Sequence, residues 1–67
     1  MRDLSRKQRE LMELVCLGKT MVEASMILGI SVEAAKSRLE EARKRLDAHK
    51  DTLAVARYLE TKYKSPY

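Results

Sequence analysis

Residues 18–46 read GKTMVEASMILGISVEAAKSRLEEARKRL, and this stretch decides the fold of the chain. Two segments with apolar residues at helical spacing flank Gly29, a residue that adopts the positive φ of a tight turn without strain. Small side chains stand where the two segments would cross, at Ala24, Ser25 and Ala35. The pattern predicts a short helix over about 21–28, a turn, and a longer helix over about 32–46, which is a helix-turn-helix.

Helical spacing also continues on both sides of this stretch, and the two-residue alternation of strands is absent. We predict a first helix over about 6–17 and a fourth over about 51–62. The expected buried positions of the first helix are Leu11, Leu14 and Val15. Those of the third are Ala35, Leu39, Ala42 and Leu46. Those of the fourth are Ala54, Val55, Tyr58 and Leu59.

The helix starts carry recognisable capping residues. Ser5 with Gln8 and Thr20 with Glu23 each match a capping box, and Ser31 is a good N-cap for the third helix. With 67 residues the chain has room for one domain. We therefore expect a single all-α, four-helix domain over residues 1–67, with frayed ends at about 1–3 and 64–67.

Composition argues against several classes of function. Cys16 is the one cysteine and His49 the one histidine, so we expect no catalytic centre, no metal site, no cofactor and no small-molecule ligand. Nothing resembles a signal peptide, and no apolar run approaches membrane-spanning length. The expectation is a cytoplasmic protein that is not an enzyme and does not enter a membrane.

The charge pattern leaves two interpretations open. The net charge is +4, and residues 36–50 contain six Lys or Arg against three acids. Such a basic helix is typical of a protein that places its second motif helix in the major groove of DNA. On charge alone, the pattern is more typical of a solvated, salt-bridged helix face, as on an ordinary helical hairpin.

A wider set of residues carries a family resemblance. These residues are Leu4, Ser5, Glu10, Leu14, Val15, Gly18, Thr20, Glu23, Leu28, Ile30, Ser31, Lys36, Leu39, Leu46 and the stretch TLAVAR at 52–57. With them the chain resembles the LuxR-type (GerE-like) helix-turn-helix domain of bacterial transcription regulators over about residues 4–59. The segment ILGISVEAAKSRLEEARKRL at 27–46 is also similar to the promoter-binding C-terminal domain of sigma factors. The short connection at 17–20 and the fourth helix favour the LuxR type.

The LuxR resemblance implies a stand-alone transcription regulator that binds double-stranded DNA as a homodimer, with the helix at 32–46 in the major groove. Carried over by position, the residues facing bases would be Glu33, Lys36, Ser37 and Glu40. Those near phosphates would be Lys19, Thr20, Arg38, Arg43 and Lys44. The fourth helix would form the dimer through its outer residues Leu53, Ala56, Glu60 and Tyr63.

Some residues depart from that pattern and support other functions. Met21 and Val22 are apolar where phosphate contacts are expected, and Glu40 adds a negative charge to the third helix. An alternative function is a small protein-binding module that modulates another regulator or RNA polymerase. A purely architectural DNA-binding protein is a third possibility, which the acids of the third helix disfavour.

Overall fold

The structure is a computed structural model, and it describes residues 4–63. Over this range it contains no strands and four helices, α1 (Arg6–Cys16), α2 (Met21–Leu28), α3 (Val32–Arg45) and α4 (Asp51–Lys62). The prediction of an all-α, four-helix fold is confirmed. Two predicted helix ends differ by one residue, because Leu17 and Leu46 are the C-cap residues of α1 and α3. The predicted frayed ends lie outside the described residues.

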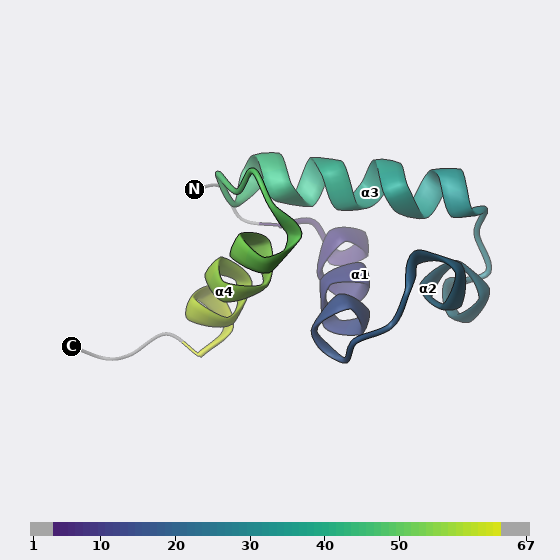
Figure 1. Ribbon diagram of the computed structural model, residues 1–67, viewed down its shortest axis with the longest axis horizontal. Coiled ribbons are helices and arrows are strands. Elements are labelled where there is room, and N and C mark those ends of the chain that lie inside the picture. The colour runs from purple at the N-terminus through teal and green to yellow at the C-terminus, as the bar shows by residue number, and fades with distance from the viewer. Residues whose placement is uncertain (1–3, 64–67) are drawn as a thin grey trace.

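The helices are arranged around α1. It packs against each of the other three, while α3 also packs against α2 and α4. Figure 1 shows α3 along the top of the molecule, with α2 below its N-terminal end and α4 below its C-terminal end. Helices α2 and α4 therefore lie below opposite ends of α3.

The core is made of side chains from all four helices and from the segments that flank them. Leu11, Met12 and Leu46 are the largest side chains that are fully buried. The predicted stripe of α3 is confirmed, since all four of its residues are buried. In α1 the prediction was too narrow: Met12 is buried, whereas Leu14 and Val15 are half-buried against the core. The helices that pack on α1 cover a side of it that includes Met12, which the predicted stripe did not contain.

Three helices end in the same way. Gly18, Gly29 and Asp47 all have positive φ, at 82°, 69° and 54°. The residue after each one donates its backbone N–H to a carbonyl five positions back, in the pairs Lys19 to Leu14 (3.0 Å), Ile30 to Ser25 (3.0 Å) and Ala48 to Arg43 (2.9 Å). This is the Schellman arrangement, which stops a helix and redirects the chain. The sequence predicted a break after Leu46 but not the left-handed backbone of Asp47.

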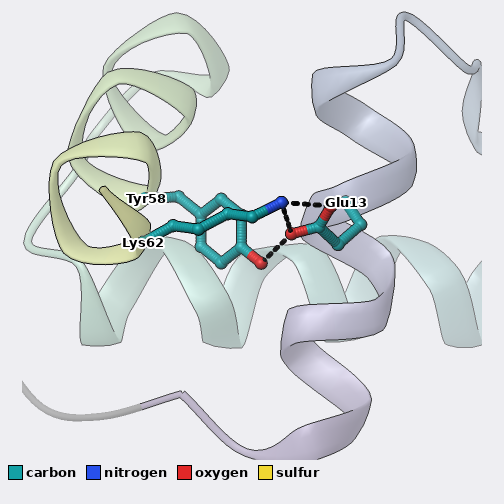
Figure 2. A network of polar contacts seen from close by, with 3 residues as sticks. All are labelled: Glu13, Tyr58 and Lys62. Atoms are coloured by element: carbon teal, nitrogen blue, oxygen red, sulfur yellow. Dashed lines mark hydrogen bonds and ion pairs between the residues drawn. The ribbon is translucent and has the colours of Figure 1, made fainter. Parts of the chain in front are cut away.

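A polar network fastens α4 to α1 (Figure 2). The Tyr58 hydroxyl donates a hydrogen bond to the Glu13 carboxylate, and Lys62 Nζ lies 2.8 Å from Glu13 Oε1 and 2.7 Å from Oε2. Hydrogen bonds from Lys62 and Tyr58 lower the pKa of Glu13. Burial, together with the bond to Glu13, raises the pKa of Tyr58 to about 12. The network holds α4 in place with an ionised carboxylate and a protonated phenol.

Within residues 4–63 no helix combines the length and the apolar character that a membrane crossing requires.

Candidate nucleic-acid interface

The first component of the candidate interface is the start of α2. Thr20 Oγ1 accepts the Glu23 backbone N–H at 3.1 Å, and Glu23 Oε1 accepts the Thr20 backbone N–H at 2.9 Å. The predicted capping box is therefore present. Its hydrogen bonds lower the pKa of Glu23 and keep the carboxylate charged at the positive end of the helix dipole. The exposed side chains of Lys19 and Thr20 stand just ahead of this helix end.

The second component is the turn into α3. Gly29 provides the left-handed residue, and Ser31 Oγ then accepts the Ala34 backbone N–H at 3.0 Å, which caps α3. The end of α2 and the N-cap of α3 therefore both lie within residues 29–31. Such a turn sets the direction of α3 relative to α2 through backbone hydrogen bonds.

Small side chains lie in the interior of the motif, as predicted. Ala24 and Ala35 have no exposed surface, and Ser25 is 3% exposed. The Ser25 hydroxyl donates to the Val22 carbonyl at 2.7 Å, so this buried polar group is satisfied within α2. Small residues allow α2 and α3 to approach closely and support α3 from behind.

The outward face of α3 is the third component. The four residues expected to face bases, Glu33, Lys36, Ser37 and Glu40, are all exposed, opposite the buried stripe of the helix. Glu41 and Lys44 are exposed beside them. We call these six residues the α3 outer face. Three glutamates and two lysines give it a formal charge of −1, so it is not a general attractor for phosphate. Contact with bases stays a prediction.

The five expected phosphate ligands lie in different settings. Arg43 is half-buried, and its Nη1 atom lies 3.4 Å from Asp51 Oδ1 at the start of α4. Lys44 pairs with Glu41 at 3.6 Å, and Arg38 is half-buried. The structure therefore directs Arg43 toward α4, and a phosphate would have to compete with Asp51 for it. The sequence could not show this, because the two residues meet only through the α3–α4 corner.

The expected dimer surface on α4 is smaller than predicted. Ala56, Glu60 and Tyr63 are exposed, but Leu53 is half-buried and packs against the core of its own chain. Its placement on the outer face was wrong because α4 contacts both α1 and α3, which widens the arc it buries. The expected inward position of Leu59 is also incorrect, since this side chain is 37% exposed.

A second surface was only partly foreseen. Val22, Met26 and Ile27 on α2 are 55%, 76% and 57% exposed, whereas Met21, an apolar residue at a position where phosphate contacts were expected, is half-buried against the core. The signal was present in the sequence of α2, MVEASMIL, which is apolar on every side. A surface helix that buries one apolar stripe normally carries polar residues on its opposite face, so apolar residues there indicate an exposed apolar surface.

The two residues with reactive side chains do not form a centre. Cys16 is half-buried against the core, and burial raises the pKa of its thiol. His49 is exposed in the α3–α4 connection. Among the described residues, no group of three or more His, Cys, Asp or Glu is placed to hold a metal ion.

Comparison with known proteins places this geometry in a family. Residues 1–46 match the model of sigma-70, region 4. This chain belongs to the sigma-70 region 4 family. The family is one of helix-turn-helix DNA-binding domains, so the chain contains a DNA-binding domain of the transcription machinery. The match covers α1 to α3 and ends at Leu46, the residue that caps α3.

Helix α4 of this region 4 chain lies beyond the matched residues. No curated protein and no solved structure matches the chain. The similarity to the sigma-factor domain is confirmed, whereas the LuxR-type assignment stays a prediction.

Proposed function

We propose that this protein is a sequence-specific transcription regulator that inserts α3 into the major groove and binds DNA as a homodimer. Its membership of the sigma-70 region 4 family supports DNA binding at promoters. The single observation that supports sequence reading is the composition of the α3 outer face. Its polar side chains are exposed on a helix that the Gly29 turn and the Ser31 cap hold in a defined direction.

These side chains match base edges chemically. Lys36 is a donor suited to the O6 and N7 acceptors of guanine, and Glu40 is an acceptor suited to the N4 amino group of cytosine. Ser37, one position after Lys36, can donate or accept. A glutamate that meets no donor is repelled by the surrounding phosphates. The charge of −1 therefore penalises unmatched sequences, which favours a regulator over a protein that coats DNA without sequence preference.

Contacts to phosphate would fix the register of α3. Lys19 and Thr20 are exposed at the start of α2, where the helix dipole also favours an anion. Lys44 is exposed near the C-terminal end of α3, and its Nζ atom lies 3.6 Å from Glu41 Oε1. Because this ion pair is on the surface, exchanging Glu41 for a phosphate as the partner of Lys44 costs little. Phosphate contacts at the start of α2 and near the C-terminal end of α3 would position the side chains between them over the bases.

The test is selection of bound sequences from random double-stranded DNA, followed by mobility-shift titration on the enriched site. Lys36→Ala should weaken binding to that site by about 1–3 kcal/mol. Lys7→Ala removes the same charge from an exposed position on α1 and serves as the matched control. Log affinity should fall with log salt by about 0.9 for each phosphate contact. Failure to enrich any sequence, or equal effects of the two variants, would contradict sequence reading by α3.

A protein-binding module acting on RNA polymerase or another regulator is the second candidate. The observations that favour it are the adjacent acids Glu40 and Glu41 on the α3 outer face and the exposed apolar side chain of Val22. Under this function the chain would bind purified polymerase and would retard no DNA from the random pool. Glu40→Lys should then weaken the complex with polymerase, whereas it should strengthen binding if α3 contacts DNA nonspecifically.

A further inference from the structure

Helix α2 exposes an apolar face that its own chain does not cover. Val22, Met26 and Ile27 lie on the side opposite the buried residues Ala24 and Ser25. We call these three side chains, with Glu23 beside them, the α2 outer face. Met26 and Ile27 line a shallow hollow of about 220 Å³ together with Lys19 and Glu23. The face is thus an apolar surface with one negative charge at its edge.

We propose that the α2 outer face binds the same face of a second copy of this chain, with the two α2 helices antiparallel. The inference rests on the homodimer of the proposed function and assigns its interface. It requires nothing of DNA, so reading of bases by α3 stands or falls separately.

The size of the apolar surface fits a dimer of modest affinity. A standard interface buries about 800 Å² on each partner, and somewhat more than half of that area is apolar. Each of the three α2 side chains is more than half exposed. Together such side chains offer roughly several hundred Å² of apolar area. A second copy would bury this amount on each side of a two-fold axis.

The charges of α2 favour an antiparallel pair. Glu23 lies in the first turn of α2 and no basic residue lies in the last turn, so nothing on this helix compensates the negative end of its dipole. An antiparallel arrangement places the negative end of each α2 beside the positive end of the other, so the two helix dipoles oppose one another. Because a two-fold interface is self-complementary, each favourable contact occurs twice.

The position of α2 leaves the proposed DNA-reading side chains uncovered. Figure 1 shows α2 and α4 at opposite ends of the molecule. The α2 outer face and the α3 outer face share no residue. By contrast, with Leu53 packed into the core, α4 offers only Ala56 and Tyr63 as exposed apolar members of the expected dimer surface. The structure therefore favours α2 over α4 as the place where two copies meet.

The experiment measures the molecular mass of the purified full chain by sedimentation equilibrium, without DNA, from micromolar to millimolar concentration. Met26→Glu places a charge in the centre of the proposed interface, and Ala56→Glu places the same charge on the α4 surface. Both sites are exposed, and circular dichroism verifies that each variant keeps its helices. We expect the unmodified chain to dimerise, Met26→Glu to weaken the dimer at least tenfold, and Ala56→Glu to leave it unchanged.

Other outcomes overturn the inference. A chain that stays monomeric at every concentration would show that a different protein, or solvent, covers the α2 outer face. A dimer weakened only by Ala56→Glu would place the interface on α4. A dimer that withstands both variants would involve neither surface. Backbone amide chemical shifts recorded on dilution give a second readout, and they should change in α2 but not in α4.

Discussion

Gly29 is the residue at which the chain turns from α2 into α3. Its backbone has φ 69° and ψ 35°, and a Cβ atom added there would meet nothing within 4 Å. The cost of a side chain at this position therefore comes from the left-handed backbone alone. Steric contact between a Cβ atom and the following carbonyl makes this conformation unfavourable for most L-residues. Glycine has no Cβ atom, and asparagine and aspartate offset the cost with local hydrogen bonds.

Gly29→Ala should lower the free energy of unfolding by about 1–2 kcal/mol. Gly29→Asn should cost less, because asparagine tolerates the left-handed region through local hydrogen bonds. Urea denaturation of the two variants and the unmodified chain measures both values. Equal losses for alanine and asparagine would show that the cost arises from something other than the backbone angle.

Glu40 and Glu41 are adjacent and both exposed, but only Glu40 is proposed to contact a base. Glu40→Gln should shift the preferred base at one position of the selected site from cytosine toward adenine, since glutamine pairs with the N6 and N7 atoms of adenine. Discrimination at that position should change by about 1–3 kcal/mol.

Glu41→Gln is the matched control for this prediction, because it removes the same charge one position away. Both variants should bind nonspecific DNA more tightly, and only Glu40→Gln should alter the selected sequence. A change of base preference in both variants, or in neither, would contradict the role of Glu40.

Among the elements, α4 depends most on a few contacts. Its Ala54 and Tyr58 are buried, Leu53 and Val55 are half-buried against the core, and the network with Glu13 is its polar attachment. Tyr58→Phe keeps the ring in the core and removes only the hydroxyl donor. The free energy of unfolding should fall by about 1.5–3 kcal/mol, the usual net value of a hydrogen bond to a charged group.

Hydrogen exchange locates this loss in the fold. Backbone amides of α4 should exchange faster in Tyr58→Phe, while those of α2 and α3 keep their protection. Tyr63→Phe is the matched control, because that side chain is 69% exposed and contacts the network only at Lys62, whose Nζ lies 5.3 Å from the centre of a ring that the substitution keeps. Similar effects of the two variants would mean that the Tyr58 hydroxyl does not anchor α4.

The pH dependence of stability is a property of the whole molecule that arises from the same network. Folding lowers the pKa of Glu13 from its ordinary 4.5, so its contribution is present above that value and is lost as pH falls through the lowered pKa. Folding raises the pKa of Tyr58 from 10 to about 12, so its contribution is complete below pH 10 and is lost as pH rises toward 12. Stability should therefore decline at both extremes.

An absorbance titration of the tyrosines measures the alkaline step. One of the three tyrosines should ionise near pH 12, and this step should be missing from Tyr58→Phe. Glu13→Gln should move the step to lower pH, because it removes the negative acceptor, and should flatten the acid decline. A Tyr58 that ionises at pH 10 in the folded chain would contradict the network.

Over the whole molecule, the residues that the sequence placed correctly are those with local causes. The capping boxes at Ser5 and Thr20 and the turn at Gly29 depend on neighbours within a few positions, so each could be predicted. The buried stripe of α3 depends on helical spacing alone. The exposure of Lys36 and Glu40 follows from that stripe, because they lie on the opposite side of the same helix.

The misplaced residues depend on the directions from which neighbouring helices pack. Helical spacing predicts one buried face, and this holds for α3, but the neighbours of α1 and α4 cover sides that the predicted stripes do not include. Met12 and Leu53 therefore became buried or half-buried although neither belonged to the predicted stripe. Arg43 was turned from the candidate phosphate contacts toward Asp51 by the angle of the α3–α4 corner, where Asp47 has a left-handed backbone.

The sequence by itself determined the four helices, the turn that joins α2 to α3, and the polar side of α3, because caps, glycine turns and helical periodicity act within one or two turns of chain. The tertiary structure alone decided how α4 attaches through Glu13, which basic residues stay available, and which side of the largely apolar α2 is left uncovered. Glu13 and Lys62 are 49 positions apart, and contacts at such a separation are set by the packing angles of helices rather than by any local pattern.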